Sequence, residues 1–153
     1  MAHATEQGSR PVHLFDAWSG LPETEEQDGE GGKKWIGQVV GSPQRVQQVM
    51  SKFSIAPDRV HIHRGWFEDT FPQATIEQIA LLHIDCDFFA ATALCLERWY
   101  PHISPGGYIQ FDDYEEFRGC TTAVNEFLER HPDIELQTFG KEGQGRAFFL
   151  QKQ

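Results

Sequence analysis

The sequence predicts a doubly wound α/β fold with a mostly parallel sheet that ends in a C-terminal β-hairpin. Short apolar strand patterns alternate along the chain with segments whose apolar residues recur at helical spacing. One strand pattern, Ile79 to Ile84, is apolar at almost every position, which is typical of a parallel strand covered by helices on both faces. The 153 residues are expected to form a single domain.

The first half of this alternation begins with a short apolar strand pattern at Val12 to Phe15, which ends at Asp16. Residues 17–41 mix acidic residues with glycines, and because they offer little apolar surface to bury we expect a mobile loop or lid. Ser42-Pro43 predicts a helix start, since serine caps a helix and proline fits its first position. Val60 to His63 then alternates in polarity and predicts the next strand.

The second half contains the apolar strand and two further helices. Apolar stripes at helical spacing run from Ala91 to Trp99 and from Cys120 to Leu128. Pro105-Gly106-Gly107 predicts a turn, and Tyr108 to Phe111 predicts the strand that follows it. The alternation of strands with helices in this order is what favours a parallel sheet.

The end of the chain predicts a hairpin. Ile134 to Phe139 alternates between apolar and polar residues, and Arg146 to Leu150 forms a last strand pattern. Lys141 to Gly145 is the expected connection between these two strands.

The composition argues against several classes of partner. The chain has 23 acidic and 13 basic residues and a formal charge of −10, whereas a nucleic-acid groove or an anionic membrane surface requires a basic face. No apolar run approaches the ~18 residues of a transmembrane helix. Met1 to Arg10 lacks the apolar core of a signal peptide. We therefore expect a cytoplasmic protein that binds neither nucleic acid nor membranes.

The three cysteines are too few and too scattered for a disulfide framework. Cys86 lies between two acids with no neighbouring histidine to activate it, so we do not expect a nucleophile. Cys95 and Cys120 fall on apolar helix faces, where core packing is expected.

Histidines and aromatic residues give weaker signals. His83 lies within the apolar strand and is expected in the core. His61 and His63 alternate on one strand and could bind a metal, although half-buried strand positions explain them as well. Trp66 and Phe67 are either core residues or a platform for an adenine ring.

Acidic residues follow the ends of four predicted strands. Because the carboxyl ends of parallel strands meet at one edge of a sheet, we expect these carboxylates to converge there. Carboxylates that lie close together repel one another unless a cation or a proton offsets the repulsion, and hard oxygen ligands suit Mg²⁺, Mn²⁺ or Ca²⁺. A single aspartate at a strand end can equally be a helix cap, so the paired motifs carry the metal prediction. The acids are Asp16, Asp69, Asp85 with Asp87, and Asp112 with Asp113.

Four motifs in a fixed order resemble the macrocin O-methyltransferase family over residues 12–150. The resemblance implies a Rossmann-like fold and S-adenosylmethionine (SAM)-dependent methylation of a hydroxyl on a small molecule, such as a sugar of a natural product. The motifs are Gly65-Trp66-Phe67-Glu68-Asp69-Thr70-Phe71-Pro72, Leu81-Leu82-His83-Ile84-Asp85-Cys86-Asp87, Tyr100-Pro101-His102-Ile103-Ser104-Pro105-Gly106-Gly107-Tyr108, and Asp112-Asp113-Tyr114 followed by Gly119-Cys120 with Ala123-Val124 and Phe127.

The resemblance also implies roles for individual residues. Asp87 matches the family's general base, and Asp16 matches the acid that binds the ribose hydroxyls of SAM. The residues that match the metal-binding aspartates, for Mg²⁺ or Mn²⁺, are Asp85, Asp112 and Asp113. The residues that match the loop lining the adenine are Gly65, Trp66, Phe67 and Asp69.

The chain departs from the family pattern at three places. Cys86 stands where the family usually has glycine, and Asp16-Ala17-Trp18 replaces a common Asp-Ser-Phe. The family's first strand and glycine-rich turn are expected before Val12, where only Met1 to Pro11 lie, so we expect an N-terminally truncated fold that binds SAM weakly or not at all. The strand edges left open then either pair directly or are filled by a second protomer in a homo-oligomer.

Two other classes of function compete with the enzyme. A methyltransferase-like fragment or interaction domain that has lost SAM binding would explain the missing glycine loop. A phosphatase of the Asp-x-Asp type would use Asp85 and Asp87, but there the motif normally follows the first strand. Detectable SAM binding separates the methyltransferase from both alternatives.

Overall fold

The computed structural model describes residues 10–140 and 146–153. The expected hairpin connection at Lys141 to Gly145 and all but the last residue of Met1 to Arg10 lie outside this range. The chain forms two compact units, the first from residues up to Gly20 with Gly37–Ala74 and the second from Leu21–Ile36 with Thr75–Gln153. The single domain expected for residues 1–153 stays a prediction.

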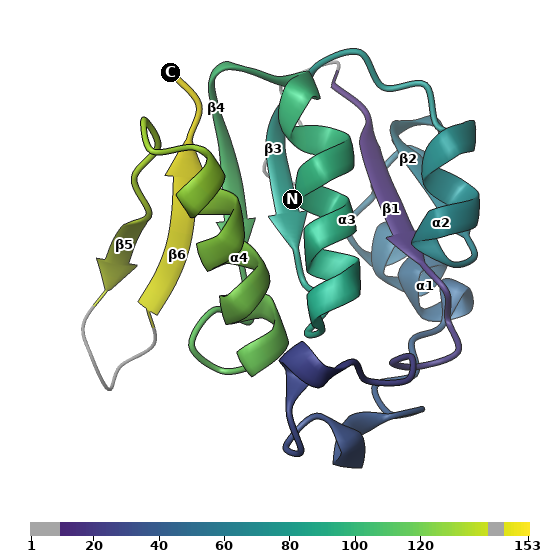
Figure 1. Ribbon diagram of the computed structural model, residues 1–153. Coiled ribbons are helices and arrows are strands. Elements are labelled where there is room, and N and C mark those ends of the chain that lie inside the picture. Colours follow the sequence, from purple (N-terminus) through teal and green to yellow (C-terminus); the bar gives the residue numbers. More distant parts are fainter. Residues whose placement is uncertain (1–9, 141–145) are drawn as a thin grey trace. The chain divides into compact units, whose positions relative to one another are not determined.

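The first unit is a parallel strand pair with short helices (Figure 1). The strands pair in register from Val12 opposite Val60 to Asp16 opposite Arg64. Ser42 caps the first helix as predicted, since its hydroxyl accepts a hydrogen bond from the amide of Arg45. The elements are β1 (Val12–Asp16), α1 (Pro43–Lys52), β2 (Val60–Arg64) and α2 (Phe67–Thr70), with 3-10 turns at Pro57–Arg59 and Phe71–Gln73.

The second unit holds a four-stranded sheet in the order β3-β4-β6-β5 (Figure 1). Strands β3 and β4 are parallel, and β4, β6 and β5 are antiparallel neighbours, so this sheet is mixed and contains the predicted parallel pairing and C-terminal hairpin. The elements are β3 (Ile79–Ile84), α3 (Phe89–Trp99), β4 (Ile103–Phe111), α4 (Arg118–Arg130), β5 (Gln137–Gly140) and β6 (Arg146–Gln151), with 3-10 turns at Glu26–Asp28, Lys33–Trp35 and Tyr100–His102.

The core of the second unit lies between this sheet and the helices α3 and α4, which lie on the same side of it (Figure 1). Cys95 and Cys120 are buried there, as predicted. The largest fully buried side chains are Trp99, Phe88, Phe111, Ile84, Leu96 and Ile109. No helix in the described part of the chain is long and apolar enough to span a membrane.

Strand β3 differs from the prediction that both of its faces are buried. Ile84 is buried, but Leu81 is 40% exposed and His83 is exposed, so the placement of His83 in the core was wrong. The physical reason is the alternation of side chains along a strand, which places Leu81 and His83 together on one face. An apolar sequence alone does not reveal which face a helix covers.

The predicted turn at Pro105-Gly106-Gly107 lies inside β4 rather than before it. The pairing of β3 with β4 jumps there from Ile79 opposite Ile103 to Leu81 opposite Tyr108, so these residues form an irregularity within a longer strand. Gly106 adopts φ = 76°, which favours glycine. The hairpin strand β5 begins at Gln137 instead of Ile134.

Candidate functional site

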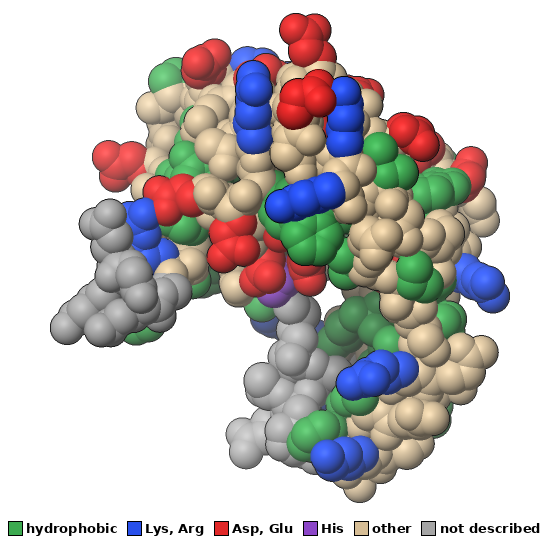
Figure 2. Space-filling model, turned by 90° about the horizontal axis from the view of Figure 1, so that it is seen from below, with side chains coloured by type: hydrophobic (Ala, Val, Ile, Leu, Met, Phe, Trp, Pro, Cys, Tyr) green, Lys and Arg blue, Asp and Glu red, His purple; other side chains and the backbone are tan. Residues whose placement is uncertain are grey.

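The acidic residues predicted at the ends of β3 and β4 lie at the same edge of the sheet. Register pairing of Ile84 with Phe111 aligns the two strand ends, and the amide of Asp112 donates to the carbonyl of Ile84 at 3.0 Å. Figure 2 looks at the end of the molecule toward which β3 and β4 run, and it shows acidic side chains gathered beside a histidine. The predicted convergence of Asp85 and Asp87 with the acids after β4 is therefore present.

The carboxylates form two overlapping groups whose ligand atoms lie within 4.8 Å of one another. One group joins Asp85, Asp87 and Asp113, and the other joins His83, Asp85 and Asp112. The imidazole Nε2 of His83 lies 3.8 Å from Oδ1 of Asp112. His83 is the site neighbour that sequence reasoning missed. The available signal was its position two residues before Asp85, which places both side chains on one face of the strand.

The loop Asp85 to Asp87 is held by backbone hydrogen bonds to Asp113. Oδ2 of Asp113 accepts from the amides of Cys86 and Asp87 at 3.1 and 3.0 Å. Asp87 has φ = 61°, a left-handed conformation that is uncommon for a residue other than glycine. These hydrogen bonds fix the backbone on the N-terminal side of Asp87, a residue that is 9% exposed.

Burial and the closeness of the other carboxylates raise the pKa values of two aspartates at this end of the sheet. Burial, and then the charges of Asp113, Asp85 and Asp112, raise the pKa of Asp87 to about 7. Burial is also the main cause that raises the pKa of Asp113. The site thus combines hard oxygen donors with closely spaced carboxylates, and this donor set fits Mg²⁺ or Mn²⁺.

The thiol of Cys86 has a different environment from its acidic neighbours. Its Sγ lies 3.5 Å from the hydroxyl of Thr92, and the side chain is 8% exposed. A hydrogen bond with Cys95 and burial raise the pKa of the Cys86 thiol well above its ordinary value. A buried neutral thiol is a poor nucleophile, and packing is the role that this environment supports.

The first unit contains all five residues predicted to bind SAM. Asp16 ends β1 and Gly65 follows β2, and the amide of Gly65 donates to the carbonyl of Asp16 at 3.0 Å. Oδ1 of Asp16 accepts from the amide of Trp18 at 2.7 Å. Gly65 has φ = 141°, and a Cβ there would lie 3.1 Å from the methyl group of Thr70, so glycine suits this position.

The remaining predicted SAM residues lie on and before α2. Trp66 precedes the helix and is 43% exposed, which leaves its ring accessible. Phe67 stacks on Phe71 with a centroid distance of 4.8 Å. Asp69 is exposed, and its carbonyl accepts a hydrogen bond from the side chain of Gln73.

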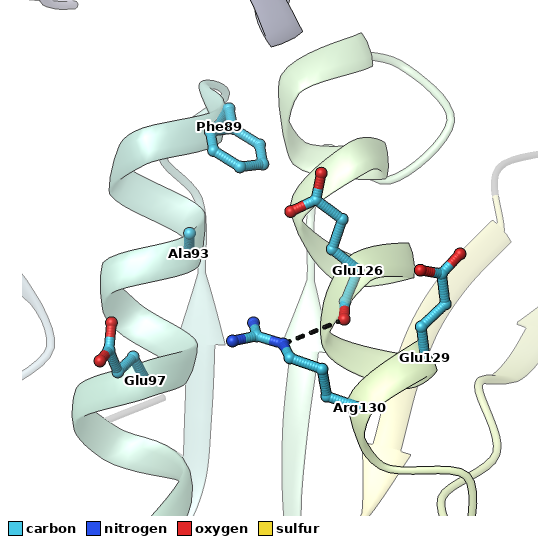
Figure 3. A pocket seen from close by; sticks show the side chains of 6 residues that line it. All are labelled: Phe89, Ala93, Glu97, Glu126, Glu129 and Arg130. Carbon is cyan, nitrogen blue, oxygen red and sulfur yellow. Dashed lines mark hydrogen bonds between the residues drawn. The ribbon is translucent and has the colours of Figure 1, made fainter.

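Two hollows lie in the second unit. One, of about 530 Å³, lies between the segment Leu21–Ile36 and the start of α4, and its lining includes Phe88, which directly follows Asp87. The other, of about 520 Å³, lies between α3 and α4 (Figure 3), and it is lined by none of the predicted site residues. Its charged groups are three glutamates and Arg130, whose Nε donates to the carbonyl of Glu126.

Comparison with known protein families identifies the family of this chain. The family described as macrocin-O-methyltransferase (TylF) matches residues 1–138. The chain belongs to this family. Its Rossmann-like fold is shared by the solved O-methyltransferase NovP, which matches with a TM-score of 0.80 and 27% identity over 97% of this chain and 62% of that chain. The calicheamicin methyltransferase CalS11, at 20% identity and a TM-score of 0.81, shows the same fold and covers 98% of this chain and 65% of its own.

Two curated relatives of this family member act on natural products, according to their names. The mycinamicin III 3''-O-methyltransferase of Micromonospora griseorubida is 34% identical over 129 residues, which are 80% of this chain and 50% of the relative. The demethyldecarbamoylnovobiocin O-methyltransferase of Streptomyces niveus is 31% identical over 141 residues, which are 88% of this chain and 53% of the relative. The chain thus spans about half the length of the curated relatives it matches.

Proposed function

We propose that the chain contains the metal-binding and catalytic aspartates of a SAM-dependent O-methyltransferase, which requires a divalent metal and methylates a hydroxyl of a small molecule. The observation that carries this proposal is the cluster of four aspartates at the ends of β3 and β4, with Asp87 among them. Membership of the family supports methyl transfer, and the names of the relatives support a sugar of a natural product as the acceptor.

Three aspartates are proposed to hold the metal, namely Asp85, Asp112 and Asp113. When bound, Mg²⁺ or Mn²⁺ would acidify and orient the acceptor hydroxyl. Oδ2 of Asp113 already accepts two backbone hydrogen bonds, which fixes the direction of this carboxylate. His83 lies beside Asp112 at 3.8 Å and would hold that carboxylate in place.

Asp87 is proposed to take the proton from the acceptor hydroxyl. A general base works best when its pKa lies near the working pH, and the pKa of Asp87 is raised to about 7. As the hydroxyl oxygen forms its bond to the methyl carbon, the bond from this carbon to the sulfonium of SAM breaks and the hydroxyl proton passes to Asp87. The left-handed backbone of Asp87, and the hydrogen bond that its amide donates to the carboxylate of Asp113, would orient the base before reaction.

The SAM residues proposed in the first unit are Asp16, Gly65, Trp66, Phe67 and Asp69. Asp16 at the end of β1 would accept hydrogen bonds from the ribose hydroxyls. The half-exposed ring of Trp66 would stack on the adenine. The strained backbone of Gly65 lets the chain pass close to the nucleoside without a side chain in the way.

Calorimetric titration of the chain with Mn²⁺ and with SAM tests the two binding steps separately. Asp85→Asn should abolish Mn²⁺ binding, and Asp16→Ala should weaken SAM binding. Asp133→Asn and Asp58→Asn are matched controls, because these acids are exposed and lie away from both clusters in sequence. Methylation is then assayed with mycinamicin III and demethyldecarbamoylnovobiocin as trial acceptors.

The outcomes separate the proposal from its alternative. Binding of Mn²⁺ that depends on Asp85, together with SAM binding, supports the enzyme. A chain that binds neither ligand at millimolar concentration would contradict the proposal and favour a methyltransferase-like interaction domain that has lost SAM binding.

A further inference from the structure

Asp28 differs from the other acids of its segment because it is buried. The segment Leu21–Ile36 carries several exposed glutamates, whereas Asp28 is 5% exposed. Both of its carboxylate oxygens accept backbone hydrogen bonds. Oδ2 accepts from the amide of Glu25 at 2.8 Å, and Oδ1 accepts from the amide of Phe89, 61 residues further along the chain, at 2.7 Å.

The bond to Phe89 supplies a helix cap that the local sequence lacks. Helix α3 begins at Phe89, and the residue in the capping position is Phe88, whose side chain cannot accept a hydrogen bond. The first amides of a helix have no partner within the helix and need an acceptor from elsewhere. A carboxylate is favourable there because the N-terminal end of a helix carries partial positive charge. Asp28 therefore caps α3 from a distant segment.

Gly119, near the start of α4, makes room for this contact. A Cβ at Gly119 would lie 1.9 Å from Oδ1 of Asp28 and 2.6 Å from the amide nitrogen of Phe89. Such distances are impossible, so any side chain at this position would displace Asp28 or the start of α3. Three elements thus meet at one carboxylate: the 3-10 turn Glu26–Asp28, α3 and α4.

The hydrogen bond from the amide of Phe89 to Asp28 is the last of a series along the loop that carries the proposed base, Asp87. The amides of Cys86 and Asp87 donate to Asp113, and the amide of Phe88 donates to the carbonyl of Cys86. The amide of Phe89 is the next along the chain, and its acceptor is Asp28. Asp113 therefore fixes one end of the loop, and Asp28 fixes the other.

We infer that Asp28 is a positioning residue, through which the docked segment Leu21–Ile36 holds Asp87 and its loop in the arrangement that binds metal. The inference rests on the proposed function for the role of Asp87 and for metal binding. Loss of the carboxylate frees the amide of Phe89 and lets residues 85–89 leave this arrangement, while the sheet behind them stays folded.

Hydrogen exchange of the whole chain tests the inference independently of any ligand. In Asp28→Ala, the amides of residues 85–89 should exchange about tenfold faster, while those of β3 stay unchanged. In Asp28→Asn, one carbonyl oxygen remains to accept from Phe89, so the effect should be partly rescued. Glu23→Ala is the matched control, because this acid of the same segment is exposed. Unchanged exchange at residues 85–89, or equal acceleration in β3, would overturn the inference.

A second variant serves if Asp28→Ala does not fold. Gly119→Ala adds a methyl group that collides with Asp28 and with the amide of Phe89, although alanine is the better helix former. Accelerated exchange at residues 85–89 with unchanged exchange in β3 would show that the junction of Asp28, Phe89 and Gly119 holds the loop, and the partial rescue in Asp28→Asn assigns the effect to Asp28. Mn²⁺ titration adds a readout of the site: Asp28→Ala and Gly119→Ala should bind about tenfold more weakly than wild type. If wild type binds no Mn²⁺, the proposed function fails, and the exchange data alone decide the role of Asp28.

Discussion

Asparagine at position 87 should stabilise the metal-free chain at neutral pH. Burial, and then the neighbouring charges, raise the pKa of Asp87 from 3.8 to about 7, so the folded state holds this proton more tightly than the unfolded state. The contribution of Asp87 to the free energy of unfolding is therefore greatest below about pH 4 and is lost as the pH rises toward 7. A pKa change of this size corresponds to ~4 kcal/mol, and screening by water and salt at the open edge reduces the expected effect to about 2 kcal/mol.

Asp87→Asn removes the charge with little change of shape. At pH 7.5 without metal, the variant should exceed wild type by about 2 kcal/mol, which is about 4–8 °C in Tm for a chain of this size. At pH 4 the two should be nearly equal, because Asp87 is then protonated in wild type. Thermal unfolding followed by circular dichroism between pH 4 and 8 measures the difference, with Asp133→Asn as the control for an exposed acid.

The same experiment with saturating Mg²⁺ should favour wild type, because a cation offsets the repulsion and stabilises the folded state that binds it. Parallel stability curves for wild type and Asp87→Asn from pH 4 to 8 would refute the electrostatic reasoning. Absence of any Mg²⁺-dependent gain in the stability of wild type would refute the assignment of Asp85, Asp112 and Asp113 as a metal site.

Three further predictions concern the rest of the chain. Leu96→Ala, at a core position that is 1% exposed, should lower the free energy of unfolding by about 2–5 kcal/mol in urea titrations, and a loss below about 1 kcal/mol would contradict the described packing. Gly65→Ala should weaken SAM binding in calorimetry, since φ = 141° strains alanine; unchanged affinity would exclude this loop from the nucleoside site. Limited trypsin digestion should cut after the exposed Lys33 or Lys34 before it cuts the helices of the core, and first cleavage after Arg98 in α3 or Arg130 in α4 would contradict this prediction.

The sequence alone predicts the elements whose local signals agree with their packing. Ser42-Pro43 starts α1, and the strand patterns at Val12 and Val60 become β1 and β2, because capping and alternation act over a few residues. The acids after β3 and β4 could also be placed together, since the carboxyl ends of adjacent parallel strands share one edge.

Other features depend on contacts that no local pattern contains. The apolar residues of α1 recur at helical spacing, which predicts a buried face, yet none of the residues in this helix is buried. The apolar sequence of β3 likewise does not show that Leu81 and His83 are exposed. Burial is decided by which surface another element covers, and that element can be distant in the sequence. For the same reason, the approach of His83 to Asp112 was not predicted.

Asp28 shows most clearly the difference between what the sequence predicts and what only the folded chain decides. From the sequence, Asp28 is one acid among several in a glycine-rich stretch, and composition favours an exposed loop. In the folded chain, its carboxylate caps α3 across 61 residues, and the absence of a side chain at Gly119 makes the approach possible. The sequence by itself determined which strand ends carry acidic residues, whereas the tertiary structure decided which acid is buried. A buried carboxylate needs donors, and only the folded chain brings the amide of Phe89 to it.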